Sequence, residues 1–151
     1  MFRREARLIL LAVELFVAAT SIVCGLGLAV GVIQFPLAFL DGSRFSDYVA
    51  PGLLMAIVVG GVPLLAAVAL RARHAAGLPL SALAGLILLG FEVVEVVTIN
   101  RNTGDWLALV LTLQSGYTTL GLAMLALAVY LWAWAPTRAR KPLDLRRARY
   151  G

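Results

Sequence analysis

Two carboxylates interrupt one of the most apolar stretches of the chain, residues 86–100. Glu92 and Glu95 are three positions apart, so in a helix both side chains project from one face. A charge deep in a bilayer costs about 3 kcal/mol on insertion scales, so it must be compensated. Two carboxylates one turn apart also repel each other when both are ionised. The pair therefore indicates either polar packing between helices or a functional proton, ion or ligand site.

An amide and a hydroxyl stand at a matching depth in the last apolar segment. Gln114 and Thr118 lie on one helical face. A rise of about 1.5 Å per residue places Gln114 roughly 12 Å from the start of its segment, as far as Glu92 lies from the end of its own. Glycines of the two earlier segments come at that depth and would leave space. The sequence thus predicts a small polar pocket in the outer half of the bundle, formed by Glu92, Glu95, Gln114 and Thr118.

Three further charged residues bear on this pocket. Arg44 and Arg101 are the only cations in the two connections on its side of the membrane, and either could pair with Glu95. Glu14 is a third acid within an apolar segment, about 10 Å from the start of that segment by helical rise. We expect Glu14 to lie too far from Glu92 for contact. It would extend toward the membrane surface or bond to a neighbouring helix.

The elements that would hold these residues are four long apolar segments. The 151 residues are 62% hydrophobic and 14% charged, with a mean hydropathy of +0.94, which is too apolar for an ordinary soluble domain. We predict an all-α fold, a four-helix transmembrane bundle, with one domain over residues 1–151, because the short connections leave no room for a soluble module. The predicted spans are residues 8–32, 51–70, 78–99 and 106–134.

Two local features are expected around the second span. Pro63 cannot donate a hydrogen bond to the Val59 carbonyl group, and two glycines precede it, so we expect a kink there. The connection 34–52 mixes aromatic and charged residues, which suits the headgroup layer of a membrane. Within this connection, Ser46 or Asp47 can cap the second span.

The distribution of basic residues sets the orientation. The net charge is +5, and all but two of the thirteen Lys and Arg residues fall at the start of the chain, between the second and third spans, or in the tail 136–151. These three places lie on one side of a four-span chain, so the positive-inside rule puts both termini in the cytoplasm. We expect the spans to lie in a bacterial inner membrane. We expect the basic flanks to contact anionic lipid headgroups, and we expect no nucleic acid partner.

The sequence carries no motif of catalysis or metal binding. The GxSxG, GxxxxGK, HExxH and CxxC patterns are all missing. His74 is the only histidine, which excludes haem ligation by two histidines, and Cys24 is the only cysteine, which excludes an intramolecular disulfide. We therefore predict no catalytic residues, no metal and no cofactor, and an enzyme is the least favoured class of function.

One stretch carries a resemblance. Residues 42–52, GSRFSDYVAPG, follow the pattern GxxFxDYxxPG, and they are accompanied by a third segment with acids and by DWLALVLTLQSG at 105–116. Over residues 25–121 the chain resembles a group of small four-span bacterial integral membrane proteins with this stretch. In size and in its glycine-rich second span ending in Arg, it is more distantly similar to the DoxX-like membrane proteins. The resemblance implies a fold and a topology, and it implies no activity.

Two hypotheses of function follow. The first is a small non-enzymatic accessory or interaction subunit with a polar outer-leaflet pocket, whose acids make contacts within or between subunits. The alternative is a proton-linked carrier or binder of a small lipophilic or cationic molecule. Since four spans are few for a carrier, the alternative requires a homo-oligomer. In either case the expected protein partner is a second copy or another membrane protein.

Overall fold

The computed structural model describes residues 2–41, 43–98 and 107–134, and within these ranges the chain is helical and contains no strand. The basic tail 136–151, Trp106 and Arg101 lie outside the described residues. In chain order the elements are α1 (Phe2–Ala29), the 3₁₀ turn η1 (Leu37–Leu40), α2 (Val49–Leu54), the π-helical segment η2 (Met55–Gly60), α3 (Gly61–Arg71), α4 (Gly77–Thr98) and α5 (Leu107–Ala133).

Four helices are long and apolar enough to cross a membrane: α1, the continuous run Val49–Arg71, α4 and α5. Their bounds lie within a few residues of the predicted spans, except that α1 begins at Phe2 and not near residue 8. The basic residues at the start of the chain are therefore helical. This extension is anchored, because Ala6 is buried and the Arg7 guanidinium donates a hydrogen bond to the Leu70 carbonyl oxygen.

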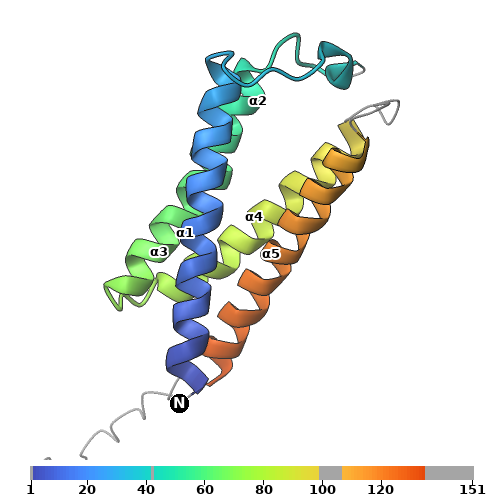
Figure 1. Ribbon diagram of the computed structural model, residues 1–151. Helices are drawn as coiled ribbons and strands as arrows, with labels where there is room; N and C mark the ends of the chain where they lie inside the picture. Colours follow the sequence, from blue (N-terminus) through green and yellow to red (C-terminus); the bar gives the residue numbers. More distant parts are fainter. Residues whose placement is uncertain (1, 42, 99–106, 135–151) are drawn as a thin grey trace, which may run out of the picture.

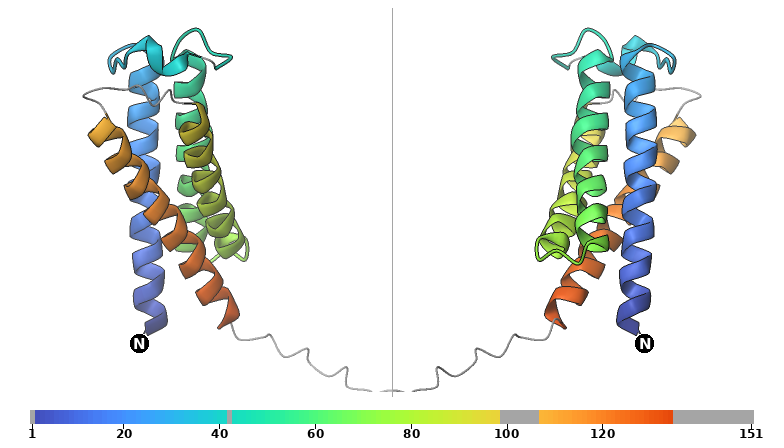
Figure 2. Two further views of the ribbon diagram at one scale, coloured as in Figure 1. Left: turned by 90° about the vertical axis from the view of Figure 1, so that its right-hand side faces the viewer. Right: turned by 90° about the vertical axis from the view of Figure 1, so that its left-hand side faces the viewer.

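The helices form two hairpins (Figure 1). One pairs α1 with the run α2–η2–α3, and the other pairs α4 with α5. The start of α1, the α3–α4 turn and the end of α5 lie at one end of the molecule, which we call the basic end, and the η1 connection lies at the other, the loop end. The hairpins meet toward the basic end and diverge toward the loop end, and α5 crosses α1 obliquely (Figure 2).

The apolar core lies where the hairpins meet. Both hairpins contribute to it, and the buried core residues of α5 come from the second half of that helix. The first half of α5 is largely exposed. The core residues are Leu10, Val17, Val59, Leu70, Ala84, Leu88, Met124 and Ala128.

Glycines bring the helices of each hairpin into backbone contact. A Cβ atom on Gly25 of α1 would lie 2.5 Å from the Gly52 carbonyl oxygen of α2, and one on Gly52 would lie 2.5 Å from the Gly25 carbonyl oxygen. In the second hairpin, a Cβ atom on Gly85 would lie 2.9 Å from the Gly121 carbonyl oxygen. Close approach at small residues is how helices associate in a medium that supplies no hydrophobic drive between them.

The irregularity expected near Pro63 takes the form of a π-helical segment, Met55–Gly60, directly before it. Pro63 offers no N–H group, and its ring crowds the carbonyl of the preceding turn, so a wider turn upstream relieves the contact. Gly60 closes the segment against α1, because a Cβ atom there would lie 2.6 Å from the Ile22 side chain. The wide turn thus packs on α1 at a position where no side chain fits.

Candidate functional site

The two acids of α4 lie together, as their spacing predicts. Glu92 and Glu95 are close enough to interact electrostatically, in the part of α4 nearer the loop end. Glu92 is 6% exposed, while Glu95 is half-buried. One carboxylate oxygen of Glu92, Oε2, is buried and has no hydrogen-bond partner among the described residues. The pair is thus a polar site inside an apolar bundle, with one buried and one more accessible member.

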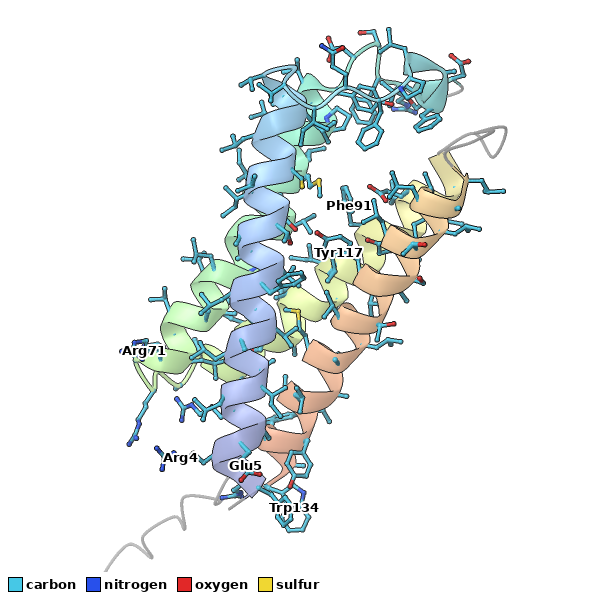
Figure 3. The ribbon with its side chains drawn as sticks, viewed as in Figure 1. Arg4, Glu5, Arg71, Phe91, Tyr117 and Trp134 are labelled. Carbon is cyan, nitrogen blue, oxygen red and sulfur yellow. The ribbon has the colours of Figure 1, made fainter. Side chains whose placement is uncertain are left out.

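Tyr117 of α5 completes this site and is not among the residues predicted from the sequence. Its phenol lies beside the Thr20 side chain of α1 and within electrostatic range of Cys24, Glu92 and Glu95. Figure 3 shows Tyr117 and Phe91 in the region between α1 and the α4–α5 hairpin. A tyrosine in the middle of a span, away from the interfacial belt where tyrosines gather, was the signal that could have found it.

We call the group Glu92, Glu95, Tyr117, Thr20 and Cys24 the polar seam. It draws side chains from α1, α4 and α5, so it joins the two hairpins at the level where they begin to diverge. The Thr20 hydroxyl also donates to its own helix, to the Phe16 carbonyl oxygen at 2.8 Å. The seam offers two carboxyl groups, a phenol, a hydroxyl and a thiol, which together can hold a proton or a small cationic or polar group.

Gln114 and Thr118 lie near this level on α5, and both are half-buried. The described side-chain hydrogen bonds of α5 run from Thr112, Ser115 and Thr119 to its own backbone. No hydrogen bond joins Gln114 or Thr118 to Glu92 or Glu95 in the part of the chain that the structure describes. Their membership of the pocket therefore stays a prediction, while Tyr117 is the α5 residue beside the acids.

The two arginines predicted as partners of Glu95 do not form the site in the described residues. Arg44 is exposed in the connection at the loop end, and Arg101 lies outside the described residues. Within the described ranges, the surroundings of Glu95 are set by its burial, with no cation beside it. An ion pair to Arg101 stays a prediction.

Glu14 lies apart from this site and is more deeply buried than Glu92. Its side chain is fully buried at 0% exposure, so it does not extend toward the membrane surface. The Ser81 side chain of α4 lies beside it, but the Ser81 hydroxyl donates to the Gly77 carbonyl oxygen at 2.9 Å. Neither carboxylate oxygen of Glu14 has a hydrogen-bond partner among the described residues, and the hydroxyl of Ser21 on the same helix has none either.

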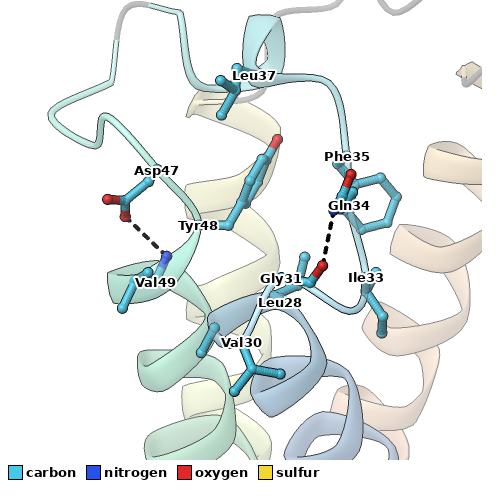
Figure 4. Close-up of a pocket in the computed structure, with 11 residues that line it drawn as sticks. Leu28, Val30, Gly31, Ile33, Gln34, Phe35, Leu37, Asp47, Tyr48 and Val49 are labelled. Carbon is cyan, nitrogen blue, oxygen red and sulfur yellow. Dashed lines mark hydrogen bonds between the residues drawn. The ribbon is translucent and has the colours of Figure 1, made fainter.

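A cavity of about 430 Å³ opens at the loop end, between the end of α1 and the start of α2 (Figure 4). Gly31, at a φ of +75°, ends α1 there, and the Gln34 amide donates to the Gly31 carbonyl oxygen at 3.0 Å. Tyr48 forms another wall and donates its hydroxyl to the Pro36 carbonyl oxygen at 2.9 Å. Burial raises the pKa of Tyr48, so its phenol remains a donor at neutral pH.

The DYxxPG part of the motif has a structural explanation at this end. The Asp47 carboxylate accepts a hydrogen bond from the Val49 N–H group at 3.0 Å and closes a turn directly before α2. The N-cap residue of α2 is Tyr48, with no side-chain cap, so the prediction that Ser46 or Asp47 caps this helix is wrong. The Tyr48 ring lies 6.3 Å from the Phe35 ring, so the two ends of the connection lie side by side. Pro51 occupies the first turn of α2, and Gly52 makes the backbone contact with α1. The motif residues thus start the second span and fix it to the first.

Among the described residues, no three His, Cys, Asp or Glu side chains are grouped so that they could hold a metal ion. Comparisons of the chain with protein-family models, with curated proteins and with solved structures found no match. What the site can do follows from its own residues. These supply proton-binding and hydrogen-bonding groups at a point where two helical hairpins separate.

Proposed function

We propose that the chain is a non-enzymatic interaction subunit of the bacterial inner membrane, with the basic end in the cytoplasm, and that it docks on another transmembrane helix through the first half of α5. The observation that carries this proposal is how little of α5 is covered. Only 17% of its apolar window is buried, against 39% for the second span. A bundle with one span so exposed is suited to receive a further helix.

One exposed side of α5 carries small and hydroxyl-bearing side chains. Its members, which we call the α5 hydroxyl face, are Ala108, Thr112, Ser115 and Thr119, spaced to lie on one side of the helix, and all four are exposed. Hydroxyl groups and small side chains are enriched where transmembrane helices pack, because they permit close approach and hydrogen bonding across the interface. Gly116, beside this face, has open space around it.

The hydroxyl groups are already satisfied within the helix. Thr112 donates to the Ala108 carbonyl oxygen at 2.7 Å, and Thr119 donates to the Ser115 carbonyl oxygen at 2.7 Å. The monomeric protein can therefore expose this face to lipid, and the hydroxyl groups can exchange their bonds within the helix for contacts with a partner. We take the partner to be a second copy of the chain, since one small-residue face can pack on itself about a two-fold axis.

Cross-linking at this face tests the proposal. In a Cys24→Ser background, Ser115→Cys should give a disulfide-linked dimer in native membranes on mild oxidation. The matched control is Leu65→Cys, because Leu65 of α3 is 61% exposed but lies on a different helix. Dimer from Ser115→Cys well above the control supports the proposal. Equal yields at the two positions, or no dimer from Ser115→Cys, would overturn it.

The polar seam supports a second candidate function, a binder or proton-linked carrier of a small lipophilic cation. The supporting observation is that Tyr117 lies beside both acids while Glu92 keeps a buried oxygen without a partner among the described residues. Tetraphenylphosphonium binding to the purified protein, measured by equilibrium dialysis, is the direct probe. Glu92→Gln should abolish binding and leave the fold intact, while Glu5→Gln, at an exposed acid near the basic end, should leave binding unchanged. Binding that survives Glu92→Gln would rule this candidate out.

A further inference from the structure

A second cavity, of about 290 Å³, lies at the basic end, at the opposite end of α4 from its two acids. It is formed by the start of α1, the turn between α3 and α4, and the end of α5. Three arginines line it, Arg3 and Arg7 from α1 and Arg73 from the turn. No acidic side chain of the described residues lines it. The cavity therefore concentrates positive charge from two separate segments on one small volume.

The arginine positions are held by the backbone around them. The Arg7 guanidinium donates to the Leu70 carbonyl oxygen, which fixes α1 against the end of α3. Arg73 has a φ of 55°, the only positive φ of a non-glycine residue among the described residues. Such a conformation is unfavourable for a residue with a Cβ atom and persists where the surroundings enforce it. Here, hydrogen bonds from the Arg73 and His74 N–H groups to the carbonyls of Leu70 and Ala69, at 3.0 and 2.9 Å, enforce it.

His74 adds a further side chain with an N–H group to the same wall. Its Nδ1 atom accepts a hydrogen bond from the Ala76 N–H group at 3.2 Å. In a neutral imidazole the other nitrogen then carries the proton, so Nε2 is available as a donor. The cavity thus combines guanidinium groups, which match phosphate oxygens in a bidentate geometry, with one further N–H donor.

The rest of the lining is apolar. Leu78 of α4 and Leu131 of α5 line the cavity together with the arginines. On α5, Leu131 stands between Tyr130 and Trp134, whose rings lie 6.4 Å apart. Aromatic pairs of this kind mark the headgroup level of a membrane protein. A ligand here would meet cations on one side and leucines on the other, at the depth where lipid headgroups join their acyl chains.

We propose that this cavity binds the phosphodiester group of an anionic phospholipid, with Arg3, Arg7 and Arg73 on the phosphate oxygens and the first part of an acyl chain against Leu78 and Leu131. The volume suits a single headgroup better than a larger ligand, whose pockets are commonly about 300–1,000 Å³. Basic pockets between transmembrane helices are known to select such headgroups. A soluble phosphate compound shares the charged part of this chemistry but has no acyl chain to contact the leucines.

Native mass spectrometry of the detergent-purified protein tests the proposal with phosphatidylglycerol, phosphatidylcholine and glycerol phosphate as probes. Phosphatidylglycerol should bind at least tenfold more tightly than the zwitterionic lipid. The variant Arg3→Gln with Arg73→Gln should lose that preference. The matched control is Arg4→Gln with Arg71→Gln. It removes the same charge at positions near Arg3 and Arg73 in the chain, from residues that do not line the cavity and that Figure 3 shows projecting outward.

Each outcome of this experiment either supports or overturns the proposed lipid site. Loss of preference in the cavity variant alone supports the site. Equal loss in the control variant means that charge near the surface acts without a site, and this overturns the proposal. Glycerol phosphate that binds as tightly as the lipid overturns the lipid assignment in favour of a soluble anion. If the double variant does not fold, Arg3→Gln alone, at the exposed start of α1, should weaken lipid binding at least threefold relative to Arg4→Gln, and equal binding by the two would overturn the site.

Discussion

The half of the bundle nearer the basic end and the half nearer the loop end are built differently. In the first, both hairpins contribute to one apolar core, and residues such as Leu10 and Met124 are completely buried. In the second, the hairpins diverge, and the side chains at the point of separation are the acids, phenol and hydroxyl of the polar seam. The closed half holds the molecule together, and the open half presents the groups that can bind or dock.

The difference also separates two kinds of acid. Glu14 lies in the closed half, with 0% exposure and no hydrogen bond to either oxygen among the described residues. Glu92 and Glu95 lie where the hairpins separate and are near a phenol. A buried polar group without a partner lowers stability, whereas one at an opening can be served by water or a ligand. Each half can be challenged with a substitution that should leave the other unaffected.

The largest contrast is expected between two glycines of α4. A leucine at Gly85 would drive its Cβ atom to 2.9 Å from the Gly121 carbonyl oxygen, so the helices must separate. Gly85→Leu should lower the free energy of unfolding by about 3 kcal/mol, the upper part of the usual range for overpacking. Gly90→Leu is the matched control, since Gly90 has nothing within 4 Å and should be neutral or slightly stabilising. Circular dichroism during titration with a denaturing detergent measures both, and equal losses would show that the two halves are packed alike.

The next effect concerns the buried acid of the closed half. Glu14→Met keeps the size of the side chain and removes two buried oxygens that have no partner among the described residues. The free energy of unfolding should rise by about 1–3 kcal/mol. Glu92→Met should gain less, because Glu92 lies among the polar groups of the seam. A loss of stability in Glu14→Met, measured in the same detergent titration, would mean that the carboxyl group is held by a favourable contact.

Much of this architecture can be predicted from the sequence, because the bilayer imposes it. Four apolar runs of sufficient length give four helices. The rise per residue puts Glu92 level with Gln114, and Tyr117, which lies near Glu92, comes three residues after Gln114 on α5. The spacing of Glu92 and Glu95 also predicts that they lie together, and they do. Depth and relative position along one helix follow from the chain alone.

The rotation of one helix against another does not follow from the chain alone. Depth and polarity predict Gln114 as a partner of the acids, but they give no indication of Tyr117, which lies beside them. The sequence predicts that Glu14 extends toward the surface or bonds to a neighbouring helix, and its burial without a bond depends on how the two hairpins pack together. Cavities such as the one lined by Arg3 and Arg73 depend on the same unpredicted packing, because they join segments about seventy residues apart.

A smaller effect is expected at the seam itself. Tyr117→Phe removes the hydroxyl beside Thr20 and should lower the free energy of unfolding by about 1 kcal/mol. Tyr130→Phe, at a residue that is 40% exposed near the basic end, should change it little. A double-mutant cycle with Thr20→Val should give a coupling energy of about 0.5 kcal/mol or more between the two positions. Strictly additive effects would show that the phenol and the hydroxyl do not interact across the opening.

The smallest effect should be confined to the loop end. Asp47→Ala removes the acceptor of the Val49 N–H group and should cost about 1 kcal/mol, as the loss of one hydrogen bond does. Because the first turn of α2 lies away from the core of the closed half, this loss should appear as local opening and not as global unfolding. Amide hydrogen exchange should become about fivefold faster at Val49 and stay unchanged at Leu88, while Asp41→Ala, at an exposed aspartate of the same connection, should alter neither. Faster exchange at Leu88 as well would show that the start of α2 and the core unfold as one unit, so that the two halves are not independent.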